Sequence, residues 1–288
     1  MAISQTLKAE RFRALHAGPE PLIVPNPWDA GTAWILSQLG FAALTTTSAG
    51  LAFSLGRPDG FGQVSRAETL ANASAIVGAT DLPVAADLEN GFGDSPAVVA
   101  ETIRLAAEAG LVGASIEDAT GDPTRPLYRL EQAVERVAAA AAAAHSLPFP
   151  FMLVGRAENY RFGKRDLDDT IRRLQAYATA GADVLFAPGI SRGEDIRAVC
   201  EAVDKPVNVV MGLNDCRLSV ADLAALGVRR ISLGASLYRA ALSEFERAAR
   251  ELKDHGTFAF ADRALSYDIL NDLMGGRGPG PGRERLPS

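Results

Sequence analysis

The sequence predicts a (β/α)8 barrel, a TIM barrel of the α/β class. Three observations lead to this fold: short apolar runs alternate with helix-length segments, eight such runs occur, and the pattern extends over most of the 288 residues. Short, continuous apolar runs are typical of strands buried on both faces of a parallel sheet. An open doubly wound sheet is the alternative, but it would normally contain fewer strands.

The expected strands share this continuous apolar character. In chain order they are Leu22–Pro25, Ala42–Thr47, Pro83–Asp87, Val112–Glu117, Phe151–Arg156, Val184–Ala187, Val207–Val210 and Arg230–Leu233. The segments between them include helical patterns, at Ala30–Leu39, Ser65–Thr80, Ser95–Ala109, Leu130–Ala144 and Leu167–Ala180. The alanine run 138–144 combines high helix propensity with room for close packing.

Three of the helix-to-strand junctions carry the same glycine. It stands at Gly40, Gly110 and Gly181, each between the end of a predicted helix and the start of a predicted strand. A glycine at this place favours a left-handed C-terminal cap, after which the next strand begins.

Residues 1–260 are assigned to the barrel, 261–274 to a C-terminal helix, and 275–288 to a tail rich in Gly, Pro and Arg that is expected to be disordered. The N-terminal segment is an amphipathic helical pattern without the apolar core of a signal peptide. No uncharged apolar run is long enough to span a membrane, so a cytoplasmic protein without a membrane partner is expected.

The formal net charge of −6 argues against an extended basic surface, and therefore against a nucleic-acid partner. The two cysteines, Cys200 and Cys216, do not form a secretory disulfide framework. Arg229 and Arg230 are adjacent; a solvated pair is the favoured interpretation, and a contact to a phosphate or carboxylate is the alternative.

Polar side chains collect where the predicted strands end, the face on which a TIM barrel carries its active site. Asp59, Asp87, Glu89 and Glu117 are expected to converge there around one arginine, Arg156. Several ionised carboxylates cannot share a small site unless a cation neutralises them. Oxygen ligands without histidine favour a hard divalent ion, Mg²⁺ before Mn²⁺.

The alternative is that such carboxylates are helix caps or loop charges, which is common for aspartate near helix starts. For Asp94 and Asp118 the two interpretations stay equally open. For Asp87 and Glu117, which stand at equivalent strand ends, a functional role is favoured.

Taken together, these motifs resemble the isocitrate lyase/phosphoenolpyruvate mutase superfamily, within which the chain is 2-methylisocitrate lyase-like with an atypical gating loop. The resemblance is carried by PVAADLENGFG (83–93), SIED (115–118) and VGR (154–156), together with NPWDA (26–30) and SLGRPD (54–59). It covers roughly residues 20–260, in the order of the eight predicted units.

The resemblance implies a barrel whose last helix is exchanged with a neighbouring subunit, in a homodimer or homotetramer. It also implies Mg²⁺ and a small 2-oxo acid as substrate. By position, Asp87 would hold the metal directly, and Asp59, Glu89 and Glu117 would hold it directly or through water.

For the substrate, the resemblance implies hydrogen bonds to its carboxylate from Thr47, Ser48 and Ala49, with Asn90 as a further binding residue. Arg156 would meet the negative charge of the substrate. Arg156, Glu117 and Asp59 are the implied catalytic residues.

The sequence departs from the family in the loop after the fourth strand. Carbon–carbon lyases of the family carry a Lys-Cys-Gly-His stretch there, whose cysteine is the acid, but residues 119–128 contain no Cys, Lys or His. The tyrosine that these lyases place at the second strand corresponds to Leu44. The histidine that the phosphonate mutases keep after the sixth strand falls near Pro188.

The sequence therefore predicts a Mg²⁺-dependent lyase that cleaves a C–C bond, or decarboxylates, next to the 2-oxo or enolate carboxylate of a small di- or tricarboxylic acid. Proton transfer would need Tyr128, Tyr160, Glu158 or a metal-bound water. The alternatives are an enzyme like phosphoenolpyruvate mutase or phosphonopyruvate hydrolase, and a non-catalytic 2-oxo acid binding protein.

Overall fold

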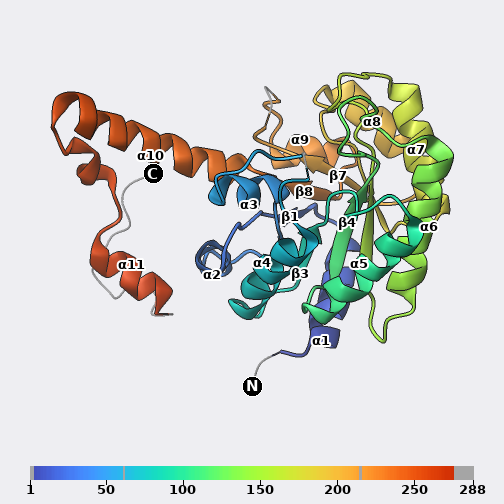
Figure 1. The fold of residues 1–288 in the computed structure, drawn as a ribbon, viewed down its shortest axis with the longest axis horizontal. Helices are drawn as coiled ribbons and strands as arrows, with labels where there is room; N and C mark the ends of the chain where they lie inside the picture. Colours follow the sequence, from blue (N-terminus) through green and yellow to red (C-terminus); the bar gives the residue numbers. More distant parts are fainter. Residues whose placement is uncertain (1–2, 61, 214–215, 276–288) are drawn as a thin grey trace.

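In the computed structural model, which describes residues 3–60, 62–213 and 216–275, eight parallel strands form a nearly closed barrel surrounded by helices (Figure 1). The strands pair in the order β1-β8-β7-β6-β5-β4-β3-β2. Between β1 and β2, the backbone N–H of Thr45 donates to the carbonyl of Pro25 at 3.1 Å. The strands are β1 Leu22–Val24, β2 Leu44–Thr45, β3 Val84–Asp87, β4 Gly113–Glu117, β5 Met152–Arg156, β6 Val184–Phe186, β7 Val207–Val210 and β8 Arg230–Ser232. This confirms the (β/α)8 fold, with each strand inside its predicted range.

The five helices predicted between the strands are also present, with ends that shift by at most two residues, whereas the predicted C-terminal helix 261–274 begins only at Tyr267 and follows a 3₁₀ turn. The helices are α1 Gln5–His16, α2 Ala30–Gln38, α3 Ser48–Ser54, α4 Arg66–Gly78, α5 Pro96–Glu108, α6 Leu130–His145, α7 Leu167–Thr179, α8 Gly193–Ala202, α9 Val220–Ala225, α10 Ser236–His255 and α11 Tyr267–Met274, with a 3₁₀ turn at Ala259–Arg263. Two of the small shifts have a simple cause. Ser65 and Ser95 are extended N-cap residues, whose hydroxyls accept from the N–H groups of Glu68 and Val98.

The three junction glycines adopt the predicted left-handed conformation. Their φ angles are 86° at Gly40, 92° at Gly110 and 104° at Gly181. A Cβ atom at Gly181 would lie 2.8 Å from the Cβ of Ala141, so the small side chains of the alanine-rich helix α6 let this junction pack closely.

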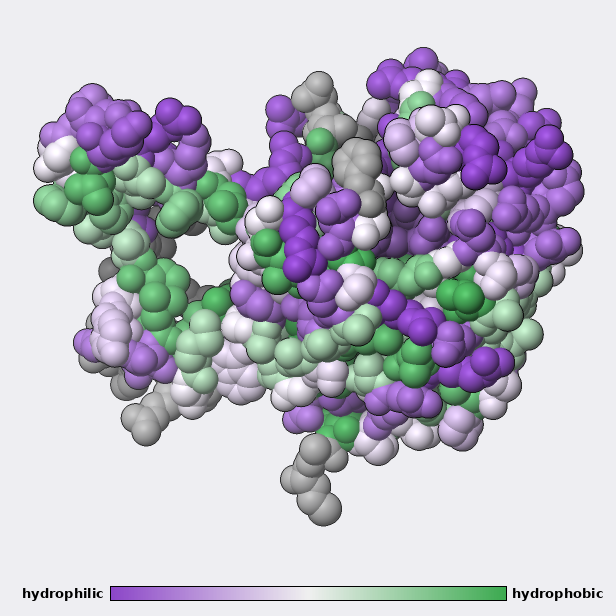
Figure 2. Space-filling view, viewed as in Figure 1, coloured by the Kyte–Doolittle hydropathy of each residue, from purple (hydrophilic) through white to green (hydrophobic). Residues whose placement is uncertain are grey.

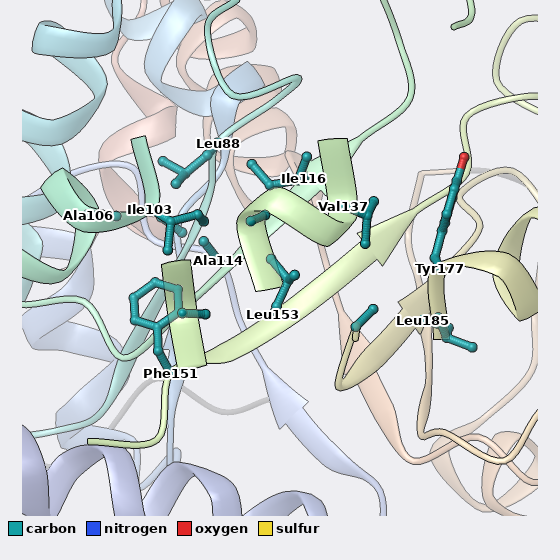
Figure 3. Packing of buried hydrophobic residues seen from close by; sticks show 14 of the residues in the cluster. Leu88, Ile103, Ala106, Ala114, Ile116, Val137, Phe151, Leu153, Tyr177 and Leu185 are labelled. Atoms are coloured by element: carbon teal, nitrogen blue, oxygen red, sulfur yellow. The ribbon is translucent and has the colours of Figure 1, made fainter. Parts of the chain in front are cut away.

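Two apolar layers hold the barrel together. Inside it, Phe12 of α1 is fully buried against strand residues such as Val24 and Val112, and α1 lies against the amino ends of the strands. The second layer lies between the strands and the outer helices, where Ile103 of α5 and Val137 of α6 pack with the β4 side chains (Figure 3). The carboxyl ends of the strands are thereby left to carry polar groups.

The C-terminal helices extend away from the barrel, as Figure 1 shows for α10 and α11. The indole N–H of Trp34 in α2 donates to the carbonyl of Leu273 at 2.6 Å, which ties α11 back to the barrel. Both helices expose apolar side chains, which form part of the hydrophobic surface in Figure 2. The most exposed in this region are Phe245, Phe258 and Tyr267.

Exchange of the last helix between subunits, and a homodimer or homotetramer, remain predictions. The predicted tail beyond residue 275 lies outside the described residues. None of the helices in the described ranges is both long enough and apolar enough to cross a membrane.

Candidate active site at the barrel mouth

Three adjacent strands end in charged side chains that meet at the barrel mouth. Asp87 ends β3, Glu117 ends β4 and Arg156 ends β5, and Glu117 is in register with Arg156. The Arg156 Nη1 atom lies 3.4 Å from Asp87 Oδ1 and 3.2 Å from Glu117 Oε2, and its Nε pairs with Glu158. One guanidinium therefore stands between the carboxylates of three residues.

Asp87 is the most strongly anchored of the predicted metal ligands. Its Oδ2 accepts from the Ser48 hydroxyl at 3.0 Å and from the Ser48 N–H at 3.4 Å, and its Oδ1 accepts from the Glu89 N–H at 3.2 Å. Burial opposes ionisation, but Arg156 and these donors outweigh it, so the pKa of Asp87 lies below its usual value. Asp87 is thus ionised at neutral pH.

The other three predicted ligands are harder to ionise. Burial and the charges of Asp87 and Asp59 raise the pKa of Glu89 to about 7. Burial raises the pKa of Asp59 as well, although Arg161 opposes the shift. The pKa of Glu117 lies well above its usual value because of burial, with Glu158 and Asp87 adding repulsion. Carboxylates that repel each other in this way favour a bound cation.

The Glu89 backbone is also unusual. Its φ angle is 48°, a left-handed conformation that costs a non-glycine residue energy and is concentrated at functional sites. This conformation places Glu89 in the turn that follows β3, where its N–H reaches Asp87.

Two cavities open at the mouth. The inner cavity, of about 400 Å³, reaches into the barrel and is lined by Asp87 and Arg156 together with side chains of β7 and β8. The outer cavity, of about 670 Å³, is lined by Glu89 and Glu117 and by residues of the loops after β2, β3 and β4. Asp59 borders both, so the cavities adjoin each other.

Arg161, which the sequence did not single out, also lines both cavities. Its Nη2 lies 3.1 Å from Asp59 Oδ2 and its Nη1 lies 3.4 Å from Glu158 Oε2. The residue belongs to no motif and lies in the loop after β5, so only the folded chain places its guanidinium beside Asp59.

The predicted substrate-binding residues fall into two groups. Thr47, Ser48 and Ala49, at the start of α3, line the inner cavity beside Asp87. Asn90 lines the outer cavity, but its amide N–H donates to the Thr120 carbonyl at 3.3 Å and its Oδ1 accepts from the Phe92 N–H at 3.0 Å. These two bonds make Asn90 a link between loops.

The side chains named for proton transfer lie away from both cavities. Tyr128 donates to Asp94 and its ring lies 4.1 Å from the Arg136 guanidinium, an arrangement that anchors the loop after β4. Glu158 is fully buried beneath Arg156, and neither it nor Tyr160 lines the inner or the outer cavity. The carboxyl groups with a raised pKa that do line the cavities are those of Asp59, Glu89 and Glu117.

The two aspartates whose role was left open have separate functions. Asp118 is buried and accepts hydrogen bonds from Tyr177, Arg173 and the Glu158 N–H, so it is a structural anchor. Asp94 accepts from Tyr128 and also borders the outer cavity.

The carboxylates at the barrel mouth fit a Mg²⁺ ion that keeps several water ligands better than a metal ion held by protein ligands alone. Within the described part of the chain, no three Asp, Glu, His or Cys side chains are placed to hold one ion together. Mg²⁺ commonly binds through one or two carboxylates and keeps several waters, which leaves room for substrate oxygens. An ionised Asp87, with Asp59, Glu89 and Glu117 nearby, suits that mode of binding.

Fold and site together define a (β/α)8-barrel protein whose carboxylates and bridging arginines at the strand ends suit a small acidic ligand. The family of phosphoenolpyruvate phosphomutase matches residues 12–253, and the chain belongs to this family. Its superfamily, that of isocitrate lyase and phosphoenolpyruvate mutase, contains lyases and mutases, which confirms the predicted superfamily.

Several named proteins are similar over most of the chain. A 2,3-dimethylmalate lyase from Eubacterium barkeri is 30% identical, over 93% of this chain and 94% of its own. A 2-methylisocitrate lyase from Bacillus subtilis is 27% identical, over 88% and 84%. A solved structure from Burkholderia cenocepacia J2315, described as a candidate lyase/mutase, is 57% identical over 96% and 97%, with a TM-score of 0.92. Oxaloacetate acetylhydrolase in complex with oxalate is 25% identical over 94% and 95%, with a TM-score of 0.84.

Proposed function

We propose that the protein is a Mg²⁺-dependent lyase that cleaves a C–C bond, or decarboxylates, next to the 2-oxo or enolate carboxylate of a small di- or tricarboxylic acid. The observation that carries this proposal is the position of Arg156 between Asp87 and Glu117 at the barrel mouth. Two strand-end carboxylates and a fixed cation suit a substrate that is itself an acid bound beside a metal ion.

In this proposal Asp87 holds Mg²⁺ directly, Asp59 and Glu89 hold it directly or through water, and Glu117 contacts it only through water, so that its carboxyl can carry a proton. Bound there, Mg²⁺ would supply Lewis-acid stabilisation of the negative charge that develops on the 2-oxo oxygen, a contribution of several kcal/mol. Mn²⁺ prefers similar ligands and is the expected substitute.

The chain's own groups orient the substrate. Ser48 presents a hydroxyl and a backbone N–H beside Asp87, and Thr47 and Ala49 line the same wall of the inner cavity. Arg156 is fixed by Glu158 and stacks 5.1 Å from the Phe186 ring, so its charge is already oriented before the substrate binds. A preorganised donor stabilises developing negative charge without reorganisation cost.

Proton transfer is assigned to Glu117. Its carboxyl lines the outer cavity, and its raised pKa allows it to hold a proton at neutral pH. Tyr128, Tyr160 and Glu158 lack access to either cavity. Glu117 would therefore protonate the substrate carbon in place of the cysteine that is missing from residues 119–128.

The similar proteins support this reaction class. Two are named for lyase activity on 2,3-dimethylmalate and 2-methylisocitrate, and a third is named for hydrolysis of oxaloacetate. Each name refers to a small carboxylic acid. A homodimer or homotetramer, with α10 and α11 at the subunit contact, is part of the same proposal.

A turnover assay tests the proposal directly. Purified protein with Mg²⁺ would be offered oxaloacetate, 2-methylisocitrate, isocitrate, 2,3-dimethylmalate and phosphonopyruvate. Release of pyruvate, glyoxylate or CO₂ would be followed, and a chelator should abolish it. Release of pyruvate and phosphate from phosphonopyruvate alone would instead indicate a phosphonopyruvate hydrolase, and its isomerisation to phosphoenolpyruvate without release would indicate a mutase.

A non-catalytic 2-oxo acid binding protein is the second candidate. It is favoured by the loop 119–128, which contains no Cys, Lys or His and is folded onto itself through the Thr120 hydroxyl and the Arg125 carbonyl at 2.6 Å. Tight Mg²⁺-dependent binding of 2-oxo acids without turnover of any of them would establish this function.

A further inference from the structure

Arg230, the first residue of β8, lines the inner cavity from inside the barrel. The prediction of a solvated pair with Arg229 is wrong for this residue. Arg229 is exposed and donates to the Pro19 carbonyl, whereas Arg230 is only 4% exposed. Because side chains alternate along a strand, adjacent arginines face opposite sides of the barrel wall, and only the fold decides which one faces inward.

The buried guanidinium has no negative partner. Among residues 3–60, 62–213 and 216–275, no carboxylate lies within 4.0 Å of Arg230, and its Nε and Nη1 atoms are buried without a hydrogen-bond partner. Its Cζ lies 5.7 Å from the ring of Phe12, the side chain that fills the barrel below it. An unpaired buried charge is strongly unfavourable unless something else compensates for it.

The titratable group nearest on α1 cannot compensate. His16 is buried, and its pKa is lowered to about 4 by burial and by the positive charge of Arg230, so it is neutral at pH 7. Burial lowers the pKa of Arg230 itself to about 10, which leaves it charged at neutral pH. The floor of the inner cavity therefore carries a net positive charge.

Arg156 and Arg230, the two buried arginines that line this cavity, differ in this respect. Arg156 already faces Asp87, Glu117 and Glu158, whose carboxylates offset its charge. Arg230 is the buried cation in this cavity that the described protein leaves without a carboxylate; Arg239, which also lacks one, is exposed. A ligand that carries a second negative group can supply one.

Two further polar groups of the floor lack a full set of partners. The Asn208 amide N–H donates to the Ser232 Oγ at 3.0 Å, which leaves the Ser232 hydroxyl proton available to donate. The Asn208 Oδ1 atom is buried without a partner. Both residues line the inner cavity and lie on β7 and β8, the strands next to or containing Arg230.

We propose that Arg230, assisted by the hydroxyl of Ser232 that Asn208 orients, forms a second anion-binding subsite on the floor of the inner cavity. It receives the carboxylate remote from the metal, and so selects dicarboxylic substrates over monocarboxylic ones. This inference rests on the proposed function, which places the first carboxylate of the substrate at the mouth beside Asp87 and Arg156.

The test compares Arg230→Met, which keeps the length of the side chain but removes its charge, with Arg229→Met as the matched control. Malate and lactate are the probes, because they share a 2-hydroxy carboxylate and differ in the second carboxylate. Calorimetry with saturating Mg²⁺ should show that the unmodified protein prefers malate. Arg230→Met should weaken malate binding by about 10- to 100-fold, the usual size for a lost charged hydrogen bond, and change lactate binding by less than about threefold.

Two further measurements separate binding from structure. Arg230→Lys keeps the charge and should retain part of the preference for malate. Without ligand, Arg230→Met should unfold at the same temperature as the unmodified protein or a higher one, because it removes an unpaired buried charge. A large fall in melting temperature, or equal losses for malate and lactate, would show that Arg230 is structural and overturn the inference.

The outcomes also distinguish this subsite from the proposed function. If the unmodified protein binds lactate and malate equally, the subsite is refuted and the proposed function stands. If it binds no 2-oxo or 2-hydroxy acid with Mg²⁺, the proposed function fails and the subsite fails with it. Loss of malate binding in Arg229→Met to the same extent would also refute the subsite.

Discussion

Glu117 and Asp118 are adjacent carboxylates at the end of β4, and both are buried. Asp118 faces the outer helices, where it accepts from the Tyr177 hydroxyl at 2.6 Å, from Arg173 Nη1 at 3.0 Å and from the Glu158 N–H at 2.7 Å. Glu117 faces the cavity, where its partner Arg156 at 3.2 Å is shared with two other acidic residues.

The different hydrogen-bond partners of the two residues distinguish a carboxylate that stabilises the fold from one that is available to a ligand. Burial raises the pKa of both groups, so burial alone does not distinguish them. Asp118 accepts hydrogen bonds from three donors, whereas Glu117 shares its partner Arg156 with Glu158 and Asp87 and is repelled by both. A buried carboxylate whose oxygens all accept hydrogen bonds stabilises the fold. Several carboxylates that repel one another favour the binding of a cation from solution.

Among the residues that line the cavities, Asp87 is the one whose loss should reduce activity most. Asp87→Ala removes the ionised carboxylate that we assign as direct metal ligand, and should lower turnover by at least about 10³-fold because the metal's contribution to the transition state is lost. Mg²⁺ titration measures the loss of metal binding, and steady-state kinetics measure the loss of turnover. Asp168→Ala, an exposed aspartate on α7, is the control. Unchanged Mg²⁺ binding in Asp87→Ala would show that the site is misplaced.

On the helix side, Asp118→Asn should mainly affect stability. It removes the ionic part of the hydrogen bonds to Arg173 and Tyr177, while Arg173 keeps Asp169 at 2.8 Å as a second anion, so the free energy of unfolding should fall by about 2 kcal/mol. Urea denaturation measures the loss, and Mg²⁺ affinity should stay within about threefold of the unmodified protein. A variant of normal stability that no longer binds Mg²⁺ would reverse the roles given to Asp118 and Glu117.

The repulsion among the carboxylates at the barrel mouth should make the stability of the metal-free protein depend on pH. The pKa of Glu89 is raised to about 7 in the folded protein, so the native state holds a proton that the unfolded state releases near pH 4.5. Metal-free stability should therefore fall as the pH rises from 4.5 to 7, by about 2 kcal/mol. Denaturation in a chelator should show this decline in the unmodified protein and a flatter profile in Glu89→Gln.

Mg²⁺ should restore the lost stability of the unmodified protein at pH 7, since it binds the folded state. The exposed Glu108→Gln on α5 is the control and should retain the full decline. Parallel pH profiles for Glu89→Gln and the unmodified protein would contradict the repulsion among the mouth carboxylates.

The smallest expected effect concerns the orientation of Asp87. Ser48→Ala removes the 3.0 Å hydrogen bond from the Ser48 hydroxyl to Asp87 Oδ2. Loss of one such bond should weaken Mg²⁺ or substrate binding by about 1 kcal/mol, roughly fivefold. Ser54→Ala, at the other end of α3 and bonded to the Leu51 carbonyl, should bind normally. Equal affinities for both variants would mean that Ser48 does not position Asp87.

The fold was largely readable from the sequence. All eight strands appear within their predicted ranges, because a strand buried on both faces needs a continuous apolar run. Gly110 and Gly181 marked helix ends correctly, since few other residues adopt a left-handed cap. The short helix α3 was missed, because Ser48–Ser54 is too short for a periodic pattern and follows directly on β2.

The candidate site was only partly readable. Asp87, Glu117 and Arg156 could be placed together, because parallel strands bring their carboxyl ends to one edge. The roles of Asp118 and Arg161 depend on partners distant in sequence, such as Tyr177 and Asp59, which no local pattern reveals.

What the sequence by itself determined is the number of strands, their order and the residues that end them, because these follow from the local periodicity of apolar side chains. What only the tertiary structure decided is which charges are compensated. Arg156 and Arg230 look alike in the sequence, yet one meets three acidic residues and the other meets none among the described residues. Electrostatic balance depends on distances across the barrel, and those distances exist only once the strands have closed around it.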